Sequence, residues 1–254
     1  MLDVHAPHAA THSWRDFFIH IATITVGLVI AVGLEQTVEA IQHQHQRQQL
    51  EEKLRGELRA NLKVDEADFR TFADIRAYLV ELKAAVSAHR HGVPQPAAPP
   101  PATDTRRQRI PIMPSVAVWD AAKLDATITL LPSREISTYS GAILQHDLLL
   151  IAVNDYQHSA FALESFEERF VDSPGAFDMG SAAPPLSLDT MTPAELMEYE
   201  SLLATYIKSI DRSVMRIRFF DVTARAILDG ANSREEVRRR LEQATGMAHA
   251  PASR

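Results

Sequence analysis

The sequence lacks cysteine altogether: none of its 254 residues is one. That absence excludes disulfide bonds, thiolate catalysis and cysteine-ligated metals. Basic residues are in the minority, with 26 lysines and arginines against 33 aspartates and glutamates, and the formal net charge is −7. Because a nucleic-acid backbone is bound through a basic surface, this acidic balance argues against nucleic acid as a partner.

Recognisable catalytic motifs are missing as well, including a serine nucleophile elbow, a phosphate-binding loop and a zinc-protease helix. Asp155 and His158 form one Asp-x-x-His pair, whereas a di-iron bundle uses two Glu-x-x-His motifs and two further glutamates. Glu39 and His43 are one helical turn apart, a spacing that can chelate a metal, but they lie in a polar stretch typical of a solvated helix. We therefore expect no enzymatic activity, no metal and no cofactor.

What the sequence does contain is an apolar run from Phe17 to Leu34, 18 residues without a charged side chain. As a helix, at about 1.5 Å per residue, it reaches about 27 Å, which matches the hydrocarbon core of a bilayer. A cleaved signal peptide would have a basic start and a small-x-small site, and neither is present. A buried helix of a soluble protein is the other alternative, but Trp14 before the run suits a membrane interface. The run is predicted to be a transmembrane helix in a lipid bilayer, after a short polar tail over residues 1–16.

Small and polar side chains recur along one side of this run at steps of three and four, namely His20, Thr23, Gly27, Ala31 and Glu35. Small residues let two transmembrane helices approach closely, so this set is predicted to be a helix–helix interface. The alternative is that His20 simply reaches the membrane interface. The first interpretation predicts a homo-oligomer or an association with other membrane proteins.

A long helix is expected to continue after the run, because residues 36–91 contain no proline and only one glycine, Gly56. The beginning of this stretch is polar and reads as a solvated neck. Farther along, apolar residues recur at helical spacing, and the stripe is Leu54, Leu58, Leu62, Phe69, Phe72, Ile75, Leu79, Leu82 and Val86. Residues 35–91 are therefore predicted to form a neck and a long amphipathic helix, which needs partner helices to be stable.

Residues 92–114 are rich in proline and are predicted to be a linker. Ser115 can cap a short helix that ends near Ala126, and Pro132-Ser133 opens a helix to about Phe170 that is apolar all round from Leu148 to Val153. An all-round apolar segment is normally buried on every side.

A long loop is expected from Pro174 to Met191, before the capping box of Thr192 and Glu195 opens a helix that Gly230 ends. Ser233 opens a last helix, and residues 247–254 are expected to be a disordered tail. Sustained alternation of apolar and polar residues is absent. The predicted class is all-α: an N-terminal transmembrane helix, a long stalk helix, and an antiparallel helical bundle over residues 115–246.

The N-terminal region also resembles a family of uncharacterised bacterial single-span membrane proteins. The similarity is carried by a histidine- and proline-containing tail at His5 to His8, by Trp14-Arg15-Asp16, by the apolar run, and by the Glu-Gln-x-x-Glu pattern from Glu35 to Glu39. The segment from Trp119 to Leu131 and the helix after it also resemble later parts of that family. The resemblance implies a bacterial single-pass protein with a helical C-terminal domain, and it brings no activity, cofactor or catalytic residue.

Two functions remain open. The first is a membrane-anchored, non-enzymatic module, a scaffold or accessory subunit that acts through protein–protein contacts. The alternative is a sensor-like bundle outside the cytoplasm that binds a small ligand, with the Pro174 to Met191 loop as a lid. We expect the bacterial inner membrane and a periplasmic C-terminal domain, although the positive charges lean slightly the other way, with Arg15 before the span and Arg47 and Lys53 after it.

Overall fold

The computed structural model describes residues 14–94, 112–170 and 187–246, apart from the side chain of Asp16. The predicted all-α class is confirmed, since every regular element in these ranges is helical. The elements are α1 (Trp14–Arg90), α2 (Ala117–Leu124), η2 (Thr127–Leu130), α3 (Ser133–Glu167), η3 (Glu168–Phe170), η4 (Leu188–Thr190), α4 (Pro193–Leu228) and α5 (Arg234–Thr245). Most of the predicted polar tail, linker and lid loop, and all of the C-terminal tail, lie outside the described residues.

The chain divides into two compact units, residues 1–51 and residues 52–254, and each is described here by itself. In the first unit, the described part of α1 exposes every described side chain from Trp14 to Gln46. Its large apolar residues are among the exposed ones, for example Ile24 at 70% and Leu28 at 65%. This segment is long and apolar enough to cross a membrane, and none of its most apolar stretch is buried.

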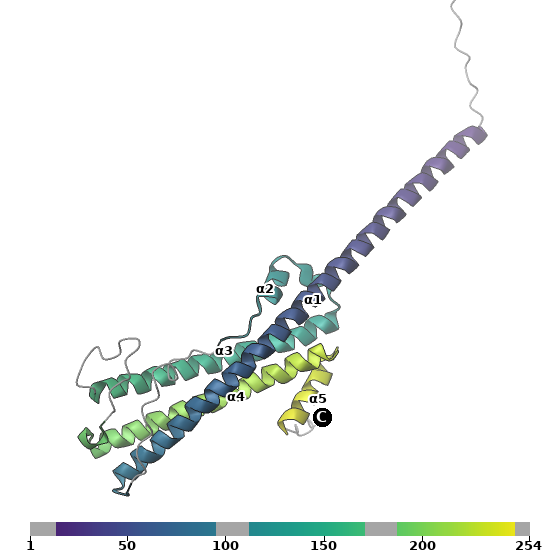
Figure 1. The fold of residues 1–254 in the computed structure, drawn as a ribbon. Coiled ribbons are helices and arrows are strands. Elements are labelled where there is room, and N and C mark those ends of the chain that lie inside the picture. Colours follow the sequence, from purple (N-terminus) through teal and green to yellow (C-terminus); the bar gives the residue numbers. More distant parts are fainter. Residues whose placement is uncertain (1–13, 95–111, 171–186, 247–254) are drawn as a thin grey trace, which may run out of the picture. The chain divides into compact units, whose positions relative to one another are not determined.

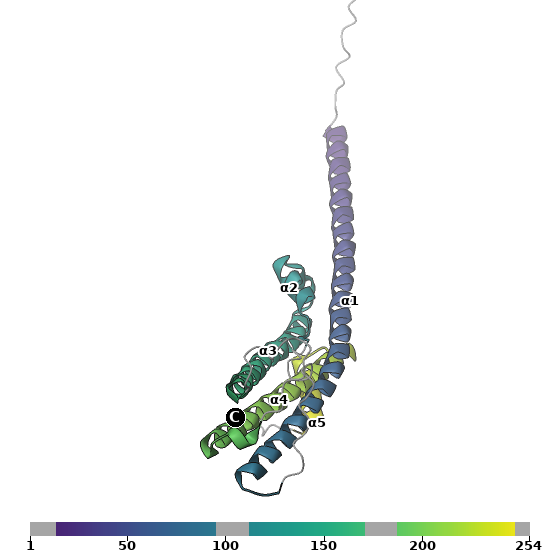
Figure 2. The same cartoon turned by 60° about the vertical axis from the view of Figure 1, so that its left-hand side comes forward.

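In the second unit, α4 lies beside the α1 residues from 52 onward, and the two helices run antiparallel (Figures 1 and 2). Arg55 donates to the carbonyl oxygen of Leu228 over 2.5 Å, at the end of α4. Farther along α1, Arg76 Nε donates to Asp211 Oδ1 over 2.6 Å, nearer the start of α4. As residue numbers rise along α1, those of the contacted α4 residues fall.

Helix α3 also runs antiparallel to α4. Ser213 donates its hydroxyl to the carbonyl oxygen of Ala152 over 3.2 Å, and the Tyr199 hydroxyl donates to Glu167 over 2.6 Å. Since α1 and α3 both oppose α4, they run parallel to each other, which a direct hairpin between them could not produce.

The segment before α2 explains how parallel packing is reached. Ser115 exchanges two hydrogen bonds of 2.8 Å each with the side-chain amide of Asn61, so the chain has travelled back along α1 by about 44 Å from Arg90. The Ser115 hydroxyl donates to Glu57 over 2.6 Å, and the cap position of α2 falls on the next residue, Val116. Ser115, which was expected to cap this helix, therefore holds the segment before α2 against α1.

The core is built from a stripe on α1 that repeats at alternating steps of three and four. The buried positions are Leu54, Leu58, Asn61, Asp65, Asp68, Phe72, Ile75, Leu79, Leu82 and Val86. Such a repeat keeps one side of the helix facing its partners, as in a coiled coil. Across from it, α4 contributes fully buried Leu203, Tyr206 and Ile210.

One expectation about α3 is wrong. The segment from Leu148 to Val153 is buried on one side only: Leu149 and Val153 face the core, whereas Leu150 is 50% and Ile151 60% exposed. Helix α3 is the second helix long and apolar enough to cross a membrane, with 39% of its most apolar stretch buried. Its inner face packs on the bundle, and its outer face has no cover among the described residues.

Candidate functional site

The predicted transmembrane interface lies entirely on exposed helix. His20, Thr23, Gly27, Ala31 and Glu35 all belong to α1 and are all exposed. Beyond the local backbone of its own helix, no atom lies within 4 Å of the point where a Cβ on Gly27 would stand. The Thr23 hydroxyl donates to the carbonyl oxygen of Ile19 over 2.8 Å. We call these five residues the ridge. The Thr23 hydroxyl is bonded within its own helix, so the ridge presents mainly small side chains, and its pairing with another helix stays a prediction.

The histidines of the neck engage separate neighbours. His43 Nε2 lies 3.9 Å from a carboxylate oxygen of Glu39, and His45 forms a 2.8 Å hydrogen bond with Gln49. In α3, Asp155 forms an ion pair with Arg212. Within the described ranges, these side chains are not gathered into a group of three or more metal ligands.

The most unusual feature of the bundle is a polar interruption of the α1 core stripe. Asn61, Asp65 and Asp68 occupy three consecutive core positions and are 3%, 1% and 5% exposed. Asn61 is matched to the backbone of Ser115, but the two aspartates put carboxyl groups where leucine would be expected. Buried carboxyl groups are costly unless they are paired or protonated.

Asp65 is held in its protonated form. Burial raises the pKa of Asp65 to about 9 from 3.8, and the hydrogen bond with Asp221, the charge of Asp221 and the charge of Asp68 add to the shift. Burial also raises the pKa of Asp221, against the opposing effects of its hydrogen bond with Asp65 and the charge of Arg225. Near neutral pH, Asp65 and Asp221 therefore share one proton between α1 and α4.

Asp221 also lines a groove between α1 and α4, to which the last residues of α5 contribute. The groove has a volume of about 890 Å³. Its walls are Phe69, Phe72, Ala73 and Arg76 of α1, Asp211, Val214, Met215, Arg218, Phe219, Asp221, Val222 and Arg225 of α4, and Ala244 and Thr245 of α5. The α1 and α4 members recur at helical spacing, so one face of each helix forms a wall. We call it the α1–α4 groove.

The three arginines of the groove are in different states. Arg76 is in a two-point ion pair with Asp211, at 2.6 and 3.5 Å. The guanidinium of Arg218 lies 6.0 Å from the centre of the Phe69 ring. Among the described residues, Arg218 and Arg225 form no salt bridge within 4 Å, and the charge of Arg225 acts on nearby Asp221. Two exposed guanidinium groups thus stand over an aromatic and aliphatic floor.

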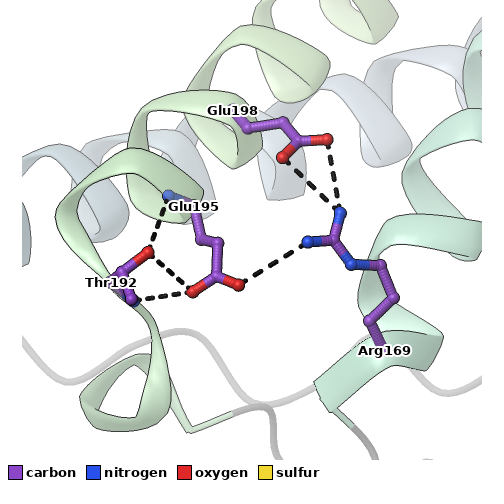
Figure 3. Close-up of polar contacts among 4 residues, drawn as sticks. All are labelled: Arg169, Thr192, Glu195 and Glu198. Carbon is purple, nitrogen blue, oxygen red and sulfur yellow. Dashed lines mark hydrogen bonds and ion pairs between the residues drawn. The ribbon is translucent and has the colours of Figure 1, made fainter.

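A second polar cluster, shown in Figure 3, connects η3, at the end of α3, to the start of α4. Thr192 and Glu195 form the predicted capping box, in which the Thr192 backbone N–H donates to Glu195 over 2.8 Å. Arg169 reaches Glu195 at 3.6 Å and Glu198 at 3.4 Å and stacks on Phe166. The Thr192 backbone N–H and hydroxyl lower the pKa of Glu195. Because these side chains bond to one another, with Arg169 shared between two glutamates, we interpret the cluster as a structural joint.

Reasoning from the sequence missed both the buried aspartates and the groove. A signal for the first was present, since Asn61, Asp65 and Asp68 continue the spacing of the apolar stripe and are the polar members of it. The groove had none, because its walls come from segments more than 130 residues apart.

Comparisons of the chain with protein-family models, with curated proteins and with solved structures found no match.

Proposed function

We propose that this protein is a membrane-anchored, non-enzymatic helical module, a scaffold or accessory subunit that works through protein–protein contacts. Its anchor is the apolar segment of α1, from Phe17 to Leu34, in the bacterial inner membrane. The bundle lies in the periplasm, because a short span ahead of a large domain without cysteine is typical of a signal anchor. The ridge from His20 to Glu35 pairs with a second copy or with another membrane helix.

The observation that carries the proposal is the outer face of α3, which none of the described residues covers. Four large apolar side chains are exposed along it, namely Leu144 at 45%, Leu150 at 50%, Ile151 at 60% and Phe161 at 62%. All four lie on one side of the helix. Viewed down the helix axis, at about 100° per residue, their positions span only about a third of a turn. A clustered apolar surface of this kind marks a contact surface, whereas single exposed leucines need no explanation.

The proposal is tested by purifying the full chain in mild detergent and measuring which membrane proteins are recovered in stoichiometric amount. The variant Ile151→Ser with Phe161→Ser should lose the partner, because it removes the apolar contact area without touching the core. Leu124→Ser is the matched control, since Leu124 is 90% exposed on α2. Recovery of the same partner with both variants, or of no stoichiometric partner with the wild type, would contradict the proposal.

A second candidate, a ligand-binding bundle, is favoured by the α1–α4 groove. Ligand sites usually have volumes of about 300 to 1,000 Å³ and combine apolar walls with a few polar groups. The groove of about 890 Å³ fits that description. A small molecule that raises the melting temperature of the full chain in a concentration-dependent way would support this function.

A further inference from the structure

We propose that the α1–α4 groove binds a small amphipathic carboxylate, whose acid group lies at Arg218 and Arg225 and whose apolar part lies over the floor formed by Phe69, Phe72 and Val222. This inference rests on the second candidate function, the ligand-binding bundle, and names the class of its ligand.

The charges of the groove favour an anion. Arg76 and Asp211 neutralise each other in their ion pair. Arg218 and Arg225 add two positive charges, and Asp221 is the other acidic residue of the lining. The walls therefore keep an excess of one positive charge, which complements a monovalent anion.

The spacing of Arg218 and Arg225 along α4 allows both to reach one acid group of a ligand that lies on the floor of the groove. They are seven residues apart on α4, so they lie on the same face about 10 Å apart along the helix axis. Guanidinium groups bind carboxylates through paired hydrogen bonds, and both side chains are exposed and able to turn toward the groove. The Phe69 ring lies next to the Arg218 guanidinium, so the apolar floor is adjacent to the charged group.

The volume of the groove favours a small molecule over a macromolecule. A helix from a partner protein is about 10 Å wide, so about 890 Å³ would hold only about two of its turns. An aliphatic or aromatic carboxylate fills such a space while its acid group stays at the exposed rim. An acidic peptide is the competing occupant that the experiment must separate.

The test uses the full chain in nanodiscs of zwitterionic lipid and octanoate that carries a photoreactive diazirine at its far end. After irradiation, mass spectrometry measures the labelling of peptides that contain Phe69 to Arg76 and Val214 to Val222. We expect saturable labelling there that unlabelled octanoate displaces. The analogue with a trimethylammonium group in place of the carboxylate should label these peptides only at background level.

The decisive variant is Arg218→Gln with Arg225→Gln, which should raise the concentration for half-maximal labelling by about tenfold or more. Arg59→Gln with Arg239→Gln is the matched control, because it removes the same charge from exposed positions outside the groove. Far-UV circular dichroism checks that all variants keep their helices. Equal labelling by the cationic analogue, an unchanged half-saturation in the groove variant, or labelling displaced by an acidic peptide but not by octanoate would each overturn the proposal.

The experiments distinguish a wrong ligand class from a wrong function. If neutral or cationic small molecules raise the melting temperature of the wild type while carboxylates do not, the groove is a ligand site of another class. If no small molecule protects the chain, the ligand-binding function fails together with this inference.

Discussion

Replacing Asp65 by asparagine is expected to change how the stability of the bundle depends on pH. Asp65 is 1% exposed and hydrogen bonded to Asp221, with Asp68 and Arg225 as the other charges acting on the pair. From α3, buried Tyr156 faces this region, and its own pKa is raised by burial, so it stays neutral. Asparagine keeps the shape of Asp65 and a donor for Asp221 but has no proton to lose.

The sign of the effect follows from the direction of the shift. The pKa of Asp65 is about 9 in the folded chain and 3.8 in the ordinary, unfolded state. Between these values the folded chain holds a proton that the unfolded chain has released. The free energy of unfolding therefore falls as pH rises, by at most about 1.4 kcal/mol per pH unit. Between about pH 6 and about pH 8 the expected loss is about 1 to 2.7 kcal/mol, since water that reaches half-buried Asp221 weakens the shift.

The assay is denaturant unfolding of the full chain in micelles at about pH 6 and about pH 8. It is followed by the fluorescence of Trp119, which is buried near Tyr139, in a Trp14→Phe background. The variant Asp65→Asn should remove this extra slope, and Asp74→Asn, an exposed acid on the same helix, should keep it. Equal slopes in the wild type and in Asp65→Asn would show that Asp65 is not protonated in the folded state.

Three further changes have expected outcomes. Gly27→Ile should reduce crosslinking between copies in membranes, because the larger side chain separates the helices, while Gly33→Ile, about 120° around the helix, should not; equal yields would exclude the ridge as the interface. Asn61→Ala should lower the free energy of unfolding by about 1 to 3 kcal/mol, because the backbone N–H and carbonyl of Ser115 lose their hydrogen-bond partners. Denaturant unfolding measures this loss. A loss no larger than that of Lys63→Ala, the exposed control, would contradict the prediction. Thr192→Ala should cost about 1 kcal/mol in the same assay by removing the cap of α4, and an unchanged midpoint would show that the cap does not contribute.

The helices were predictable because their signals are local. The Thr192–Glu195 capping box opens α4 as expected, and Gly230, with φ +91, follows its end because a left-handed backbone favours glycine. Ser233 opens α5 as expected and accepts a hydrogen bond from the Glu236 backbone N–H, while the Glu236 carboxylate forms an ion pair with Arg240. The predicted burial of Leu150 and Ile151 failed, because composition shows that a segment is apolar and not how many neighbours surround it.

By itself, the sequence determined the helical class, the exposed apolar segment from Phe17 to Leu34, and the spacing that puts Asp65 on the core face of α1, since all of these depend on residues within a few turns of one another. Only the tertiary structure decided that α1 and α3 run parallel, that Asp65 meets Asp221, and that Arg218 and Arg225 overlook a groove floored by Phe69. The physical reason is that a helix repeat specifies which side of each helix is apolar, whereas the partner that covers that side is chosen by packing among all the helices at once.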